Sequence, residues 1–186
     1  GTTTAAMLLV DEGRLDLDTP VVDYLPWWAA GDPAKESVTV RHLLLHRAGL
    51  PPFRLFYLEM EGRDAYLSAI GGLELDYEPG TRTVYSDIGF MTLAFIIETV
   101  SGQRLDEFLE ERVWDRLGMR DTGFRPARAL RNRIAPTEVD TLFRNTHVHG
   151  VVHDENAYAI GGVAGHAGLF STTEDLAVLA LLTGGT

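Results

Sequence analysis

Apolar residues recur at helical spacing along most of the chain, separated by turns rich in glycine and proline. Three clear helices are predicted, over residues 2–12, 87–101 and 105–117, and each is followed by a glycine that can end it. Less regular helices are predicted over residues 39–47 and 53–70. The pattern therefore predicts a visible chain that is mostly helical.

Capping residues indicate where two further boundaries lie. Thr39 precedes an apolar segment and is a candidate N-cap, and Ser171 with Glu174 has the spacing of a capping box before a last helix. Residues 121–145 are irregular and rich in arginine, with one short strand predicted over residues 133–139. The irregular part of the molecule is thus expected in the second half of the chain.

The composition is that of an ordinary globular domain, with 186 residues, of which 45% are hydrophobic and 23% charged. No apolar run reaches the ~20 residues that a membrane-spanning helix needs. The net charge of −11 argues against nucleic acid as a partner, because phosphate binding needs basic patches. The lack of cysteine excludes disulfides, thiolate nucleophiles and cysteine-ligated zinc.

Both ends of the chain look like interruptions of a longer protein. The sequence opens on Gly1 within a predicted helix and stops at Thr186 just after another one. We therefore expect residues 1–186 to form one partial domain, truncated at both ends. The pattern leaves the compartment, exported or cytoplasmic, and the oligomeric state open.

The segment Tyr85-Ser86-Asp87 stands directly before the long apolar helix and has two interpretations. In the first, Ser86 is the N-cap and Asp87 complements the positive end of the helix, which is worth ~0.3–1 kcal/mol. Tyr85 then packs on Phe90 as a hydrophobic staple. In the second, the helix end and a nearby ammonium stabilise the phenolate of Tyr85, whose ordinary pKa of ~10 makes it a poor base without such help.

Four segments, in order along the chain, resemble the serine β-lactamase, penicillin-binding-protein and esterase superfamily. They are LLVDEGRLDLDTPVVDYLP (8–26), VTVRHLLLHRAGLP (38–51), the segment from EPGTRTVYSD to RDTGF (78–124) and GGVAGHAGLFSTTEDLAVLA (161–180). The resemblance implies a mixed α/β (α+β) transpeptidase-like fold, an antiparallel sheet flanked by helices, of which this chain supplies mainly the helical part. It also implies a bacterial serine hydrolase that works through an acyl-enzyme, with no metal or other cofactor.

Hydrolases of this family use three motifs, Ser-x-x-Lys, Tyr-x-Asn and Lys/His-x-Gly. The first cannot occur here, because Asp32 stands three residues before the only lysine, Lys35, and the resemblance places it just before Gly1. The second corresponds to Tyr85 through Asp87, with aspartate in place of asparagine, and implies catalytic roles for both residues. The chain by itself is therefore expected to be inactive.

The third motif is matched only superficially, by His166-Ala167-Gly168, since the family motif lies later, on a strand, whereas a helix follows here. The carboxylate of Asp87 accepts but cannot donate a hydrogen bond, so we expect esters or small, peptidoglycan-like peptides as substrates in preference to β-lactams. The expected substrate-binding residues are Ser86, Asp154, Asn156, His166 and Gly168.

Two other functions stay open. One is a non-catalytic relative whose cleft only holds peptidoglycan-like ligands. The other is a zinc hydrolase, because the segment 147–155 carries three histidines and two acidic residues, with a His-x-His spacing that puts two imidazoles on one face of a strand. These residues are His147, His149, His153, Asp154 and Glu155. The pairs His42 with His46 and Trp27 with Trp28 are interpreted as packing residues.

Overall fold

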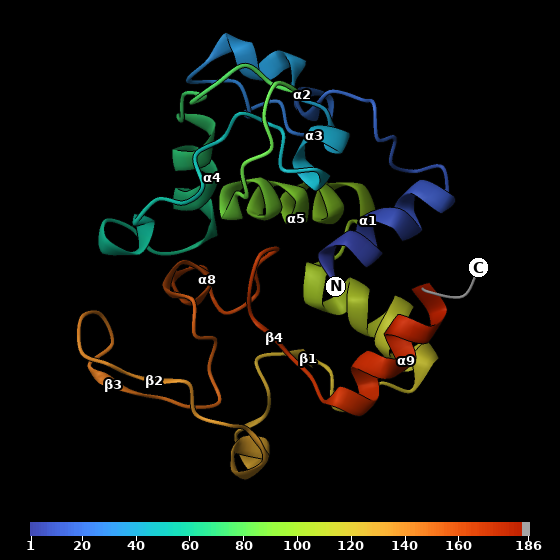
Figure 1. Ribbon diagram of the computed structural model, residues 1–186, viewed down its shortest axis with the longest axis vertical. Coiled ribbons are helices and arrows are strands. Elements are labelled where there is room, and N and C mark those ends of the chain that lie inside the picture. Colours follow the sequence, from blue (N-terminus) through green and yellow to red (C-terminus); the bar gives the residue numbers. More distant parts are fainter. Residues whose placement is uncertain (184–186) are drawn as a thin grey trace.

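The computed structural model describes residues 1–183, whose arrangement is shown in Figure 1. The helices are α1 (Thr2–Asp11), α2 (Val21–Tyr24), α3 (Val40–Leu44), α4 (Arg63–Gly71), α5 (Asp87–Ser101), α6 (Leu105–Leu109), α7 (Asp115–Leu117), α8 (Glu155–Ala159) and α9 (Thr173–Thr183). They are accompanied by the 3₁₀ turns η1 (Pro33–Ser37), η2 (Phe56–Leu58) and η4 (Arg128–Arg133) and by a π-helical turn, η3 (Glu110–Trp114). The strands are β1 (Gly123–Phe124), β2 (Glu138–Asp140), β3 (Thr146–Val148) and β4 (Leu169–Phe170).

The helix α5 is the central element of the fold (Figure 1), because it is apolar on nearly every side. Residues 91–97 are all buried, and α1 and α3 pack against them from neighbouring layers. Ser86 is its N-cap, with Oγ accepting a hydrogen bond from the Gly89 N–H at 3.2 Å. Gly102 ends the helix in the left-handed conformation, at φ 75°. The predicted helix and both of its ends are confirmed.

The only lysine, Lys35, is buried in the turn η1 and connects this turn to the end of α4. The Nζ atom of Lys35 donates to the carbonyl oxygens of Ile70, Gly71 and Leu73 at 2.8, 2.9 and 3.2 Å. It also lies 4.4 Å from the ring centroid of Trp28, which is fully buried. Burial lowers the pKa of Lys35 to about 8. Trp28 is thus a packing residue, as expected, and Lys35 has a structural role.

The strands form two small antiparallel sheets in the irregular part of the chain, β1 with β4 and β2 with β3. An almost fully buried ion pair stabilises the β2–β3 hairpin, with Arg144 Nε 2.7 Å from Asp140 Oδ2. Arg144 also donates to the carbonyl oxygens of Val152 and His153 at 2.8 and 2.7 Å, which connects the hairpin to the segment before α8. Helices together with antiparallel strands confirm the expected α+β class.

The helix that follows Thr39 is shorter than predicted. Thr39 is its N-cap, as expected, and its Oγ1 accepts a hydrogen bond from the His42 N–H at 3.4 Å. The helix ends at Leu44, and His46 then takes a left-handed conformation with φ 53°. The expected end at residue 46 or 47 is therefore wrong, because the chain turns here and places His46 against the segment before α5.

Three other elements differ in extent from the predictions. Residues 53–70 are not one helix, because Gly62, with φ 82°, separates η2 from α4. The helix over 105–117 is present but passes through the π-helical turn η3. The predicted strand at 133–139 is observed only as β2, which starts at Glu138. Among residues 1–183, no helix is both long and apolar enough to cross a bilayer.

The last helix has a different cap from the one predicted. The Oγ1 of Thr172 accepts a hydrogen bond from the Asp175 N–H at 3.3 Å, and α9 starts at the next residue. The expected capping box of Ser171 and Glu174 is therefore wrong by one residue. The reason is tertiary, because Ser171 Oγ lies 2.7 Å from the hydroxyl oxygen of Thr122.

Candidate active site

A pocket of about 270 Å³ opens where three distant parts of the chain meet. These parts are the start of α1, the segment before α5 and the glycine-rich loop before β4. The start of α1 lies in the middle of the molecule, beside α5 and β4 (Figure 1). The pocket lining includes Gly1 and Thr2 from the first part, Tyr85 and Phe90 from the second, and Gly165 and His166 from the third.

The cap of α5 holds the backbone around Tyr85 while the phenol stays open to the pocket. Ser86 Oγ donates to the carbonyl oxygen of Pro51 at 2.7 Å, and the Asp87 N–H donates to that of Pro52 at 2.9 Å. Tyr85 nevertheless keeps 61% of its residue surface exposed. The capping interpretation is confirmed, and the same cap leaves the phenol exposed beside the pocket. A catalytic role for Tyr85 stays a prediction.

The expected staple between Tyr85 and Phe90 includes a third ring, that of His46. This ring stacks on Phe90 with centroids 4.8 Å apart, and its centroid lies 4.7 Å from that of Tyr85. Its Nδ1 accepts a hydrogen bond from the Ser86 N–H at 3.1 Å. The sequence indicated His46 only as a packing partner of His42. No local pattern connects positions separated by 40 residues.

On the opposite wall, His166 is paired with Asp154. The His166 Nε2 atom lies 2.9 Å from Asp154 Oδ1, and only 2% of the His166 side chain is exposed. Asp154 is also the N-cap of α8, because its Oδ1 accepts a hydrogen bond from the Ala157 N–H at 2.7 Å. Burial raises the pKa of Asp154. The hydrogen bonds from His166 and from backbone N–H groups lower it by more, so the net shift of this pKa is downward.

The loop that carries His166 approaches α5 very closely. A side-chain carbon at Gly165 would overlap the carbonyl oxygen of Phe90, so only glycine fits there. The Thr2 hydroxyl donates to the carbonyl oxygen of Gly165 at 2.6 Å, which ties the loop to the start of α1. These contacts bring His166 into the pocket that Tyr85 faces.

Two carboxylates, those of Asp87 and Asp154, act on the Tyr85 phenol, although neither lines the pocket itself. One carboxylate oxygen each of Asp87 and Asp154 and one ring nitrogen of His166 all lie within 4.8 Å of one another. Burial raises the pKa of Tyr85, and the carboxylates of Asp87 and Asp154 raise it further. The positive end of α5 alone therefore does not make Tyr85 a base. A cation placed between the phenol and the carboxylates would oppose this shift, because it stabilises the anions.

Four of the expected binding residues do not line this pocket. Asp154 contacts His166 but itself lines another cavity. Ser86 is buried in the cap of α5. Asn156 is buried, accepting at Oδ1 from the Tyr66 hydroxyl at 2.8 Å and donating through Nδ2 to the Arg54 carbonyl at 2.8 Å, so it joins α8 to the 54–66 segment. Gly168 supplies a left-handed turn, at φ 109°, and lines a different cavity. The structure thus brings together Tyr85, Asp87, Asp154 and His166.

The histidines predicted as zinc ligands do not converge. The ring centroids of His147 and His149 are 6.5 Å apart, and the Nε2 of His149 lies 2.8 Å from each of two backbone carbonyl oxygens. His153 Nε2 lies 3.4 Å from Glu138 instead. Within residues 1–183, the groups with metal-compatible spacing are Asp87 with Asp154 and His166, and Glu138 with Asp140 and Glu155. The 147–153 histidines therefore do not form a metal site among themselves.

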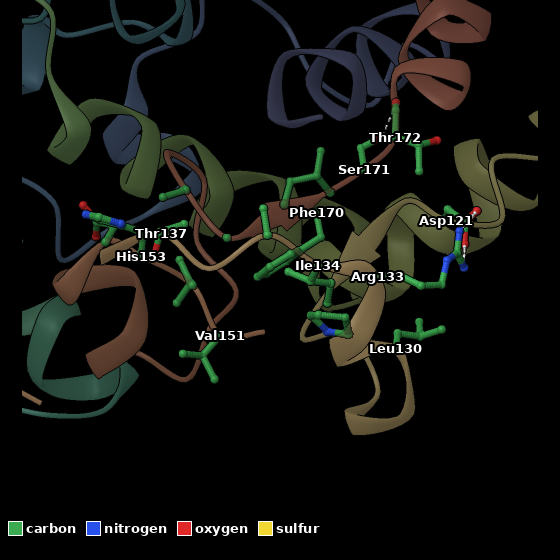
Figure 2. A pocket seen from close by; sticks show the side chains of 17 residues that line it. Asp121, Leu130, Arg133, Ile134, Thr137, Val151, His153, Phe170, Ser171 and Thr172 are labelled. Atoms are coloured by element: carbon green, nitrogen blue, oxygen red, sulfur yellow. Dashed lines mark hydrogen bonds and ion pairs between the residues drawn. The ribbon is translucent and has the colours of Figure 1, made fainter. Parts of the chain in front are cut away.

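A larger cavity, of about 670 Å³, adjoins the pocket and shares Ala167 and Leu169 with it. Figure 2 shows the Arg133–Asp121 ion pair at one end of this cavity and His153 at the other, with mostly apolar side chains between them. Cavities of this size accommodate small ligands. A ligand bound in the Tyr85 pocket could therefore extend into the larger cavity beside it.

Comparison with known sequences finds one protein family and several bacterial relatives. The profile of the Beta-lactamase family matches residues 2–186. A protein of Escherichia coli strain K12 named D-alanyl-D-alanine carboxypeptidase is 35% identical over 210 positions, covering 99% of this chain and 48% of the relative. An N-acetylmuramyl-L-alanine amidase of Bacillus subtilis is 36% identical over 202 positions, covering 96% and 46%. The chain thus spans about half the length of these relatives.

Solved structures agree on the fold. A beta-lactamase/D-alanine carboxypeptidase of Pseudomonas syringae has a TM-score of 0.78 at 21% identity, covering 100% of this chain and 48% of that one. A class C beta-lactamase of Rhodobacter sphaeroides has a TM-score of 0.76 at 25% identity, covering 100% and 49%. The expected transpeptidase-like fold is confirmed. On the sequence matches and the shared fold together, the chain belongs to the beta-lactamase family.

Proposed function

We propose that the whole protein is a serine hydrolase that cleaves a small ester, amide or D-alanyl peptide through an acyl-enzyme. The proposal rests on one observation: Tyr85, His166 and Gly1 at the start of α1 all line the same pocket. In this family the Ser-x-x-Lys motif belongs just before the helix that corresponds to α1. Residues preceding Gly1 would then bring the serine and lysine to this pocket, where Tyr85 is available as the proton acceptor.

The proton chemistry follows from the charges around Tyr85. Its raised pKa disfavours the phenolate, and a lysine ammonium between the phenol and Asp87 would offset this effect. The phenolate then takes the serine proton as the serine oxygen attacks the substrate carbonyl carbon, and it returns the proton to the leaving alcohol or amine. Water attacks the acyl-enzyme by the same route, releasing the acid and restoring the serine hydroxyl.

Asp87 and the relatives together indicate the class of substrate. Two relatives are named for D-alanyl-D-alanine and N-acetylmuramyl-L-alanine linkages, so we infer a peptidoglycan-derived peptide as the substrate. The Asp87 carboxylate can pair with the lysine but cannot donate a hydrogen bond to a substrate carbonyl. Esters and small peptides are therefore favoured over β-lactams. The test is Asp87→Asn, which should lower the ratio of aryl-ester to cephalosporin turnover, and an unchanged ratio would refute this role.

The proposal is tested by replacing Tyr85 in the full-length protein. In Tyr85→Phe, kcat/KM for a p-nitrophenyl ester and for a D-alanyl-D-alanine peptide should fall by about 10²- to 10⁴-fold, the usual worth of a positioned base. The matched control is Tyr24→Phe, which removes a hydroxyl that accepts from the Asp16 N–H at 3.0 Å outside the pocket. Its kcat/KM should stay within about twofold of the wild-type value.

Two results would contradict the proposal in different ways. Turnover that is equal in wild type and Tyr85→Phe would remove Tyr85 as the base. A full-length protein that hydrolyses neither substrate, takes no fluorophosphonate label, yet binds muropeptides saturably would be the non-catalytic binding relative.

A further inference from the structure

His46 occupies an unusual position at the turn after α3. Its backbone is in the left-handed region, with φ 53°, which costs most residues other than glycine free energy. Its side chain and its carbonyl group both face the segment that carries Tyr85. The strained turn is what directs them there, because α3 has ended at Leu44.

Two hydrogen bonds from this residue bracket Tyr85. The His46 carbonyl oxygen accepts from the Val84 N–H at 2.9 Å, and the His46 Nδ1 accepts from the Ser86 N–H at 3.1 Å. Val84 and Ser86 are the residues directly before and after Tyr85. The backbone on both sides of the phenol is therefore held by a single residue from another element.

The imidazole ring also fills the space behind the phenol. It stacks on Phe90 at an interplanar angle of 21° and contacts the Tyr85 ring at 39°, with centroids 4.8 and 4.7 Å away. Phe90 belongs to the first turn of α5 and lines the pocket. His46 thus sets both where the Tyr85 backbone lies and on which side its ring rests.

We propose that His46 is a positioning residue that holds Tyr85 in the geometry required for proton transfer, an inference that rests on the proposed serine-hydrolase function. It acts through the Val84 and Ser86 hydrogen bonds and through ring contact, and does not itself touch the reacting atoms. The role requires the neutral imidazole with its proton on Nε2, because only an unprotonated Nδ1 can accept the Ser86 N–H.

The charges around His46 agree with a neutral ring. Burial lowers the pKa of His46, while the negative charge of Asp87 on α5 acts in the opposite direction. Tyr85, which is uncharged below its own raised pKa, is the other titratable group in contact with the ring. At low pH, protonation of His46 at Nδ1 would place an N–H against the Ser86 N–H. The segment that carries Tyr85 would then lose this hydrogen bond.

The experiment compares two replacements in the full-length protein. His46→Phe keeps a ring against Tyr85 and Phe90 but removes the acceptor, so kcat for the aryl ester should fall by about 10- to 100-fold with little change in KM, as expected for a misplaced base. His46→Asn keeps an acceptor at the position of Nδ1 and tolerates a left-handed backbone. It should recover most of kcat and lose the acidic decline in activity that His46 causes.

The control is His42→Phe, four residues earlier on α3. His42 Nδ1 accepts from the Thr39 N–H at 3.2 Å within the cap of α3, and its ring does not make the bonds that hold Val84 and Ser86, so this variant should lose stability without losing kcat. A kcat that is equal in His46→Phe and wild type, while Tyr85→Phe is inactive, would overturn the inference and leave the proposed function standing.

A second measurement does not depend on turnover. Amide hydrogen exchange in the full-length protein should be faster at Ser86 in His46→Phe than in wild type and should return close to wild type in His46→Asn. Exchange at Ser86 that is equal in wild type and His46→Phe would overturn the inference even for a protein that shows no hydrolysis.

Discussion

The two walls of the candidate pocket are built in different ways. Tyr85 stands on a helix cap whose residues are neighbours in sequence, and most of α5 behind it is buried. His166 stands on a loop that has no regular structure and is held by contacts to Asp154, Thr2 and Phe90. The helix start of the Tyr85 wall follows local preferences, with further support from His46, Pro51 and Pro52. The His166 wall has no such local element and depends on contacts far away in sequence.

This difference predicts how each wall should respond to substitution. Changes on the Tyr85 wall remove one capping interaction and leave α5 in its apolar surroundings. Changes on the His166 wall disturb a close approach between two backbones, which cannot relax locally. We therefore expect the largest effects on stability at the loop and smaller effects at the cap.

The largest effect is expected for Gly165→Ala. The added methyl group would overlap the Phe90 carbonyl oxygen, so the loop must move away from α5. The free energy of unfolding should fall by about 3 kcal/mol, the cost of overpacking a rigid contact, and ester hydrolysis should fall with it. Urea denaturation of the full-length protein measures the first quantity.

The matched control is Gly123→Ala. An added carbon at Gly123 meets nothing within 4 Å, and its backbone is in an ordinary strand conformation, so stability should change by less than about 0.5 kcal/mol. Equal losses in Gly165→Ala and Gly123→Ala would show that the close approach to α5 is not what holds the loop.

A smaller effect is expected for Ser86→Ala. The variant loses the cap to the Gly89 N–H and the hydrogen bond to the Pro51 carbonyl, so the free energy of unfolding should fall by about 1–2 kcal/mol. The matched N-cap variant, Thr172→Ala at α9, loses only one such bond and should lose less. Thermal or urea unfolding measures these losses of stability. A larger loss in Ser86→Ala than in Gly165→Ala would contradict the expected order of the two walls.

The smallest effect on stability is expected for Asp154→Asn, which changes charge and little else. Asparagine can still cap α8 and bond His166, but the negative charge that helps raise the pKa of Tyr85 is gone. The pKa of Tyr85 should therefore fall, and because the phenolate is the active form, the acidic limb of the kcat/KM profile should move to lower pH.

The control for this prediction is Asp115→Asn, which changes an exposed carboxylate on α7 that is not among the charges raising the pKa of Tyr85. It should leave the profile in place. If the acidic limb of the kcat/KM profile moves equally in both variants, the shift reflects net charge alone. If this limb moves to higher pH in Asp154→Asn, the predicted fall in the pKa of Tyr85 is contradicted.

The sequence determined the long helix α5 of this protein and the cap that presents Tyr85. The α5 helix, its Ser86 cap and its Gly102 end were all predictable, because capping and apolar periodicity act between residues a few positions apart. The family resemblance, carried by short ordered motifs, was readable for the same reason. Tyr85 could therefore be singled out before any coordinates.

Only the tertiary structure decided which residues share the pocket with Tyr85. His166, paired with Asp154, reaches it through the close approach of Gly165 to Phe90. His46 packs against Tyr85 because a left-handed turn ends α3 early. Asn156, predicted at the site, became a buried connection instead. These outcomes depend on contacts between segments tens of residues apart, whose free energies arise from packing and burial that no local sequence pattern encodes.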